Sequence, residues 1–305
     1  MQILRTPDDR FDNLPDFPWP PSYVEVDAGE PGGERLRVAY VEAGPADGPV
    51  VMCLHGEPTW SFLYRKVMRV LADAGCRAIA FDLVGFGRSD KPVAVTDYTY
   101  ARQVEWTRAA AFDQVGLRDV TLVGQDWGGL IGLRLVAENP DRFARVVAAN
   151  TGLPDGRHEM PEVWWMFRTA VEKAERLDIA RFVASGCRTP PPGEVLAAYD
   201  APFPDETFKA GARAFPSLVP TAADDPAAVA NQKAWEVLSG LDLPFLCAFS
   251  DSDPITGPMA PVLARAMPGA AGREHPTIRG AGHFLQEDAG EELGRIVADF
   301  VTAGH

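Results

Sequence analysis

The 305-residue sequence lacks the features of a membrane-spanning, exported or nucleic-acid-binding protein. No stretch approaches the roughly 18 continuous apolar residues of a membrane span. The N-terminal segment MQILRTPDDR carries charges where a signal peptide needs an apolar core. Only 29 lysines and arginines stand against 43 acidic residues, and the net charge of −14 repels a phosphate backbone. We therefore expect a cytoplasmic protein that binds neither membranes nor nucleic acid.

The sequence is also poor in cysteine. Its four cysteines, at positions 53, 76, 187 and 247, show no C-x-x-C spacing, and three of them lie in apolar, strand-like runs. Such isolated cysteines are usually small buried hydrophobic residues in a reducing compartment. Neither an H-E-x-x-H zinc motif nor a Walker phosphate-binding loop is present. We therefore expect no disulfide, no metal and no cofactor.

What the sequence does contain is an alternation of apolar runs and helical patterns. Hydrophobic residues make up 46% of the chain, which is enough for a large core. Because most of the apolar runs are continuous rather than alternating, they predict a parallel sheet covered by helices on both faces. The predicted strands span residues 23–27, 36–42, 50–54, 76–81, 120–123, 146–149, 245–249 and 276–278. Helices are predicted near residues 62–72, 100–115, 128–138, 259–267 and 291–301.

The alternation is interrupted in the middle of the chain. Residues 153–240 contain helical patterns, many prolines and an aromatic cluster, but no comparable apolar strand. We therefore predict a core domain made of residues 1–152 and 241–305, with residues 153–240 inserted as a helical cap domain. The cap is expected over the carboxyl edge of the strands, where open α/β sheets bind their ligands.

The sharpest local motif is GQDWGG at residues 124–129, which follows an apolar strand and opens an amphipathic helix. This context is typical of a nucleophile elbow, a tight turn between two glycines that projects one side chain above the sheet. The nucleophile position holds Asp126, whose simplest alternative role is that of a helix N-cap. An ionised carboxylate needs no base for attack on a saturated carbon, but the resulting ester needs one to activate the hydrolytic water.

The candidate base is His283, in the glycine-rich segment GAGHF after the last predicted strand. Its orienting acid is expected in SDSDP, residues 250–254, which offers Asp253 and its competitor Asp251. Nucleophile, acid and histidine then follow in the chain order of α/β-hydrolases. The oxyanion of ester hydrolysis needs backbone N–H donors, and in this fold these are Trp127 and a residue of the loop HGEPTW, here Glu57. The role of the Glu57 side chain stays open.

Together these segments resemble the haloalkane dehalogenases, in the subfamily whose acid follows the strand after the cap. The similarity covers nearly the whole chain and includes HGEPTWSFLYRK (55–66), FDLVGFGRSDKP (81–92), DYTY (97–100), VGQDWGGLIGLRL (123–135), YDAPFPDETFKAGARAFPSLVP (199–220), SDSDPITG (250–257) and GHFLQED (282–288). The resemblance implies an α/β-hydrolase fold, with a mostly parallel sheet flanked by helices and an inserted helical cap. It further implies Asp126 as nucleophile, His283 as base, and Asp253 rather than Asp251 as acid.

The resemblance also implies that two tryptophan side chains bind the halide. An indole N–H can donate but not accept, so a pair of them in an apolar pocket selects an anion. Trp127 is the first donor, and the spacing to the aromatic Phe167 favours Trp164 as the second. Trp165 is its rival, because neighbouring residues on a helix point about 100° apart and only one can face the cavity. A proline near position 216 is a further candidate contact of the halide.

The predicted reaction is hydrolysis of a small neutral halogenated alkane to a primary alcohol and a halide ion, in a protein expected to be a monomer. An epoxide hydrolase would need acidic donors such as cap tyrosines, and the cap offers only Tyr199. A haloacid-cleaving enzyme would need a cation soon after the nucleophile, where no charge occurs before Arg134. A non-catalytic binding protein on the same scaffold would typically have lost a member of the site, and none is missing.

Overall fold

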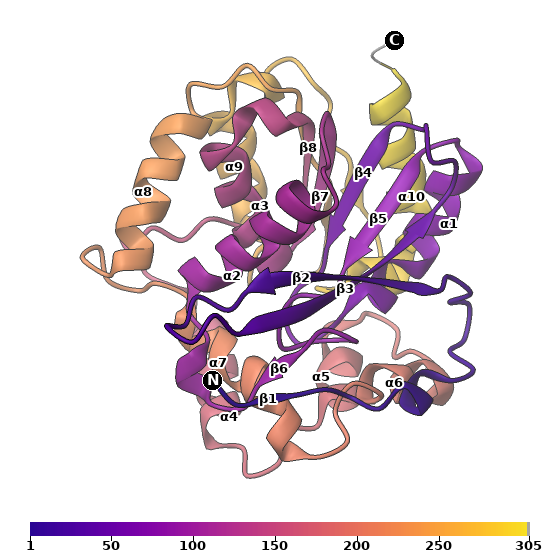
Figure 1. The fold of residues 1–305 in the computed structure, drawn as a ribbon. Helices are drawn as coiled ribbons and strands as arrows, with labels where there is room; N and C mark the ends of the chain where they lie inside the picture. Colours follow the sequence, from indigo (N-terminus) through magenta and orange to yellow (C-terminus); the bar gives the residue numbers. More distant parts are fainter. Residues whose placement is uncertain (304–305) are drawn as a thin grey trace.

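The computed structural model describes residues 1–303 and has a seven-stranded sheet at its centre (Figure 1). The strand order is β2-β3-β5-β4-β7-β8-β9. Strand β3 pairs antiparallel with both neighbours and the other pairs are parallel, so the predicted mostly parallel sheet is confirmed. The strands span Pro21–Asp27 (β2), Arg35–Ala43 (β3), Val50–Leu54 (β4), Arg77–Phe81 (β5), Val120–Gln125 (β7), Phe143–Ala149 (β8) and Phe245–Cys247 (β9).

Helices cover both faces of this sheet, which explains the continuous apolar runs of its central strands. Every residue of β7 is buried, and so is every residue of β4 after the first. Helix α1 (Arg65–Asp73) packs against α10 (Leu285–Thr302) on one face. Helices α2 (Tyr100–Arg108) and α3 (Trp127–Glu138) pack together on the other face (Figure 1).

Three helices differ from their predicted bounds. The helix predicted over 62–72 begins as a 3-10 turn, Ser61–Tyr64, and α1 starts only at Arg65. Helix α10 begins at Leu285 rather than at residue 291, and a non-helical Ala289 (φ −143°) interrupts it. The apolar pattern in the sequence therefore predicted only the second part of this helix, after the interruption. The predicted helix over 100–115 is α-helical as far as Arg108 and continues as a π-helical segment, Ala109–Gln114.

The predicted strand over 245–249 divides into β9 and a two-residue strand β10 (Phe249–Ser250). Strand β10 leaves the main sheet and pairs in parallel with β11 (Thr277–Ile278). A further antiparallel pair, β1 (Ile3–Leu4) with β6 (Lys91–Pro92), was not predicted, because two-residue strands carry no readable periodicity.

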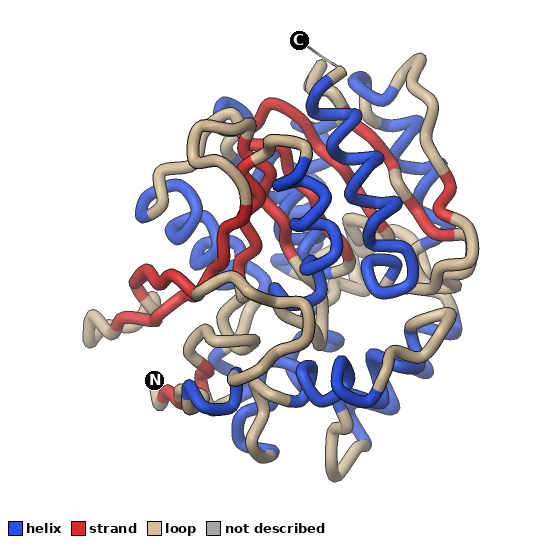
Figure 2. The backbone as a smooth tube through the Cα atoms, turned by 90° about the vertical axis from the view of Figure 1, so that its right-hand side faces the viewer, coloured by secondary structure: helices blue, strands red, loops and turns tan. Residues whose placement is uncertain are grey.

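Between β8 and β9 the chain forms five α-helices and one 3-10 helix, Glu206–Lys209, and no strand occurs in residues 150–244, all of which are described. We call these residues the helical insertion. Helices α4 to α7 gather at one end of the sheet (Figures 1 and 2), whereas α8 lies beside α3 (Figure 1). The five helices span Glu162–Lys173 (α4), Ile179–Gly186 (α5), Gly193–Asp200 (α6), Ala210–Leu218 (α7) and Pro226–Leu238 (α8). The last helix of the core before α10, α9 (Ala260–Ala266), packs against β9.

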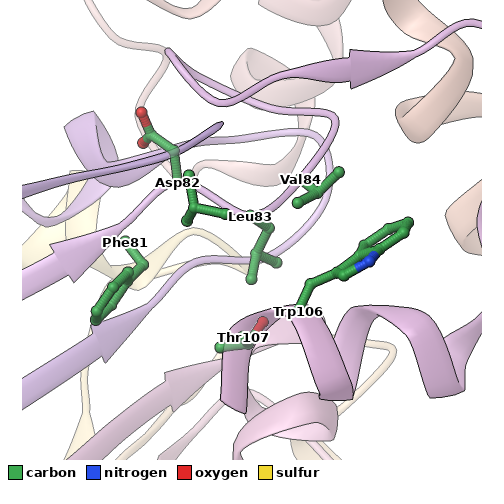
Figure 3. A pocket seen from close by; sticks show the side chains of 7 residues that line it. Phe81, Asp82, Leu83, Val84, Trp106 and Thr107 are labelled. Carbon is green, nitrogen blue, oxygen red and sulfur yellow. The ribbon is translucent and has the colours of Figure 1, made fainter. Parts of the chain in front are cut away.

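A small void lies between the sheet and α2. It is lined by residues that include Asp82, Trp106 and Thr107, and its volume is about 10 Å³ (Figure 3). That volume holds one water molecule at most, so the void belongs to the packing of the core and not to a binding site. None of the helices in residues 1–303 is both long and apolar enough to cross a membrane.

Candidate active site

Asp126 occupies the sharp turn between β7 and α3. Its backbone angles, φ 50° and ψ −126°, lie in a region that residues other than glycine rarely adopt. Strand and helix approach so closely here that a Cβ on Gly128 would lie 2.0 Å from the carbonyl oxygen of Leu54. Asp126 stands at the N-cap position of α3, but its side chain makes no capping hydrogen bond to the helix.

The two carboxylate oxygens of Asp126 face different neighbours. Oδ1 accepts a hydrogen bond from the backbone N–H of Glu57 at 2.8 Å. Oδ2 lies 3.6 Å from Nε2 of His283. The second predicted donor, the Trp127 N–H, makes no hydrogen bond to this side chain within residues 1–303. Oδ1 is therefore held by the backbone, while Oδ2 is the oxygen that faces the histidine.

His283 and Asp253 are joined directly. Nδ1 of His283 lies 2.9 Å from Oδ2 of Asp253, whose side chain is completely buried. Asp253 is fixed in turn by the hydroxyl of Thr256 and by the backbone N–H of Ile255, which donates to Oδ1 at 2.9 Å. Its competitor Asp251 is exposed and accepts instead from the Gly280 N–H at 3.0 Å. The geometry thus pairs His283 with Asp253.

Electrostatics set the protonation of the site. Burial alone would lower the pKa of His283, but the charges of Asp253 and Asp126 and their hydrogen bonds outweigh it and raise this pKa to about 10. Burial also opposes ionisation of Asp253, yet the His283 charge and its hydrogen bonds hold the pKa of Asp253 below its usual value. Burial and then the Asp126 charge raise the pKa of Glu57 well above its usual value. At neutral pH the resting site therefore holds a protonated His283.

Two residues of the site were missed by the sequence analysis. Asn150 is fully buried at the end of β8, and its amide donates to the backbone carbonyls of Gly282 and His283 at 2.9 and 3.0 Å. The backbone carbonyl of Asn150 accepts from the Asp126 N–H at 3.0 Å, so this residue links the nucleophile to the histidine loop. The amide nitrogen of Gln125 lies 3.1 Å from Nε2 of His283. A polar residue directly after a buried strand was the signal that could have identified Asn150.

A cavity of about 1100 Å³ opens over Asp126 and is lined by both the core and the helical insertion. Three of its wall residues are tryptophans: Trp127, Trp164 and Trp235. The indole N–H of Trp235 donates to the carbonyl of Leu153 at 2.8 Å. Within residues 1–303 the indole N–H groups of Trp127 and Trp164 have no acceptor, so both are free to bind a ligand in the cavity.

The rival of Trp164 points away from this cavity. Trp164 is 5% exposed and lines the wall, whereas Trp165 is 42% exposed and does not. Phe167 and Pro216, singled out from the sequence, both line the cavity as well. Tyr199 does not, because it is fully buried and its hydroxyl donates to Glu287. The wall also includes charged residues, among them Asp155, Arg157, Glu159 and Arg188, but Trp164, Phe167 and Pro216 contribute apolar surface to it.

The structure offers no evident place for a metal ion. Residues 1–303 contain no group of three or more histidine, cysteine or acidic side chains that could hold one. The arrangement instead provides a carboxylate, a histidine with its own acid, a backbone donor and two free indole donors around one cavity. These groups are suited to forming and then hydrolysing an ester, with an anion held nearby.

Comparison with known proteins finds relatives that match nearly the whole chain. A family model described as alpha/beta hydrolase fold matches residues 49–290. The chain is 50% identical to the haloalkane dehalogenase of Psychrobacter cryohalolentis, over 99% of this chain and 98% of that protein. It is 51% identical to haloalkane dehalogenase 1 of Mycobacterium tuberculosis, over 96% of both chains. A solved tetrameric structure of a haloalkane dehalogenase from Paraglaciecola agarilytica is similar at a TM-score of 0.89, with 36% identity and 97% coverage of both chains.

Proposed function

Because the chain belongs to the haloalkane dehalogenases of the α/β-hydrolase fold, we propose that it hydrolyses a carbon–halogen bond through an ester formed on Asp126. The observation that carries this proposal is the position of the Asp126 carboxylate. One of its oxygens is held by a backbone donor and the other faces His283, in a cavity with two free indole N–H groups. We further propose that residues 153–240 serve as the cap that closes this cavity.

In the first step, Oδ2 of Asp126 attacks the carbon that bears the halogen. The carbon–halogen bond breaks with its electron pair on the halogen, which leaves as halide, and the Oδ2–carbon bond forms. Trp127 and Trp164 donate to the departing halide. A hydrogen bond to a charged group is worth about 1.5–3 kcal/mol, so two that strengthen with the developing charge accelerate the step roughly 10²–10⁴-fold.

In the second step, water attacks Cγ of the ester and His283 takes its proton. The negative charge develops on Oδ1, which already accepts from the Glu57 N–H. The Trp127 N–H adds a second donor as the carbonyl becomes tetrahedral. Collapse of this intermediate releases the alcohol and leaves a water-derived oxygen in the Asp126 carboxylate. The net products are an alcohol, a halide ion and a proton.

The charge of Asp126 links the two steps. In the resting state it lies 3.6 Å from Nε2 of His283 and helps to keep that ring protonated. Ester formation removes this charge, so the pKa of His283 falls and the ring can give up its proton to solvent. The histidine therefore becomes a base only once there is an ester to hydrolyse.

A neutral haloalkane is the substrate class that this cavity favours. The two arginines in its wall, Arg157 and Arg188, are both exposed, so they belong to the mouth rather than to the surroundings of Asp126. No tyrosine is among the described lining residues, and an epoxide oxygen would therefore lack the phenolic donors that an epoxide hydrolase supplies.

Halide release tests the proposal. The parent protein should release one bromide per molecule of 1-bromobutane hydrolysed, and Asp126→Ala should lose this activity while remaining folded. An epoxide of similar size serves as the control substrate and should not be opened. Bromide release that persists in Asp126→Ala would refute the assignment of the nucleophile.

A further inference from the structure

Two neighbouring carboxylates, Glu287 and Asp288, follow His283 in the first turn of α10, and the proposed reaction uses neither of them. Both are tied to segments distant in sequence, on the core side and on the side of the helical insertion. These contacts affect the position of His283. The inference drawn from them rests on the proposed function of that histidine.

Asp288 joins the histidine loop to the helical insertion. Its Oδ2 accepts from the backbone N–H of Gly282, the residue before His283, at 2.9 Å. The same oxygen accepts from the Arg188 N–H at 2.7 Å, and Oδ1 accepts from the Thr189 N–H at 2.9 Å. One side chain therefore binds three backbone N–H groups, one beside the histidine and two beyond the end of α5.

The two segments joined in this way are in direct contact. A Cβ on Gly282 would lie 2.4 Å from the carbonyl oxygen of Gly186, and a Cβ on Gly186 would lie 2.6 Å from the Phe284 ring. The Phe284 N–H also donates to the Gly186 carbonyl at 3.3 Å. Residues 185–188 line the cavity, so the segment that Asp288 holds is part of the substrate-facing wall.

Glu287 anchors the same turn to the rest of the molecule. It forms a buried ion pair with Arg65 of α1, in which each side chain is 3% exposed, and Nη2 of Arg65 lies 2.8 Å from Oε2. It also accepts from the hydroxyl of Tyr199 in α6. Lys66 donates to its backbone carbonyl at 2.6 Å. The turn that carries Asp288 is thus fixed to both the core and the insertion.

We propose that Asp288 is a positioning residue for His283. It holds the histidine loop against the wall segment 186–189 and so keeps His283 in place for ester hydrolysis. Within residues 1–303 the Asp288 carboxylate accepts hydrogen bonds only from the histidine loop and that segment, whereas the Asp126 carboxylate is held by the Glu57 N–H. Loss of the Asp288 carboxylate therefore affects the step that needs His283 and spares the alkylation of Asp126. Misplacement of a reacting group by about 1 Å can slow a step up to about 100-fold.

Single-turnover kinetics with 1-bromobutane separate the two steps. Rapid quenching followed by intact-protein mass measurement gives the rates at which the butyl ester forms and disappears. In Asp288→Ala we expect ester formation within about 2-fold of the parent and ester hydrolysis slowed by about 10-fold or more, with the ester accumulating. Asp288→Asn, which keeps one acceptor oxygen, should be slowed less, and it carries the test if the alanine variant does not fold.

Glu292→Gln is the matched control, because it removes one charge from an exposed position of the same helix. It should leave both rates unchanged. The inference is overturned if the folded Asp288 variants keep the parent rate of ester hydrolysis, or if both steps slow in parallel.

His283→Phe separates failure of this inference from failure of the proposed function. That variant should trap the butyl ester on Asp126. If no ester forms in it, the covalent route itself is wrong. If the ester is trapped there but the Asp288 variants hydrolyse it normally, only the positioning role is wrong.

Discussion

At the scale of single residues, the orientation of one indole decides which tryptophan can help a halide to leave. Trp164 faces the cavity with a free N–H and Trp165 faces outward. Trp164→Phe should therefore weaken bromide binding and lower kcat/KM by roughly 10–100-fold, because one hydrogen bond to an anion is lost. Trp165→Phe should change both by less than about 2-fold. Bromide titration by fluorescence and steady-state kinetics give the ranking, and the reverse order would exclude Trp164 as donor.

The protonation of His283 is a second property of single residues. The Asp126 charge contributes to the raised His283 pKa of about 10, so Asp126→Asn should lower that pKa. Because this pKa is higher in the folded protein than in the unfolded chain, protonated His283 stabilises the fold. The contribution is complete at a pH below about 6.5, the unfolded value, and is lost as the pH rises through about 10. In Asp126→Asn the loss should come at lower pH. NMR titration of the ring measures the shift, and an unchanged pKa would contradict the proposed coupling between the two steps.

The sequence predicted some of these residues better than others. Asp126 and His283 stand in glycine-rich motifs next to predicted strands, so their positions could be read directly. Asp253 and Asp251 lie two residues apart in one loop, and only the folded loop shows which of them reaches the imidazole. Asn150 belongs to no motif, because its role depends on three segments that meet only in the fold.

At the scale of secondary-structure elements, the elbow depends on the close approach of β4, β7 and α3. Gly128→Ala would place a methyl group 2.0 Å from the Leu54 carbonyl oxygen, so it should destabilise the protein by about 1–3 kcal/mol or more. Gly193→Ala, at the start of α6 with nothing within 4 Å of the new Cβ, is the matched control and should have little effect. Thermal unfolding measures both, and equal stabilities would mean that the elbow can relax.

Elements were predictable where they are long and buried, and less so where tertiary contacts set their ends. The strands β4 and β5 coincide closely with apolar runs in the sequence, whereas β7 and β8 contain the predicted runs but extend beyond them by two and three residues. The start of α10 does not, because its first turn carries the polar pair Glu287 and Asp288, whose partners lie in other segments. The short pairs β1 with β6 and β10 with β11 are likewise defined by neighbours rather than by their own pattern.

At the scale of the whole molecule, the core and the helical insertion together enclose the cavity. Its volume of about 1100 Å³ lies slightly above the range of roughly 300–1,000 Å³ that is typical of sites for small organic molecules. We therefore predict that kcat/KM is maintained or rises from 1-bromobutane to 1-bromooctane, since each buried methylene contributes about 0.8 kcal/mol. A halide-release series over chain length measures this, and a steep fall beyond four carbons would contradict it.

The overall architecture followed from the sequence because alternating strands and helices leave few arrangements. The size of the cavity did not, because it depends on how α4, α5 and α7 pack over the strand ends. The monomeric state also remains a prediction, since assembly depends on surface shape that no sequence pattern encodes.

The most direct test of the account follows the oxygen atom in a single turnover, with enzyme in excess over a haloalkane in ¹⁸O-labelled water. Water that attacks the ester carbonyl must deliver its oxygen first to the Asp126 side chain. The account predicts label in the peptide that contains Asp126 and unlabelled alcohol. Label in the alcohol after that first turnover would show direct attack of water on carbon and contradict the covalent route.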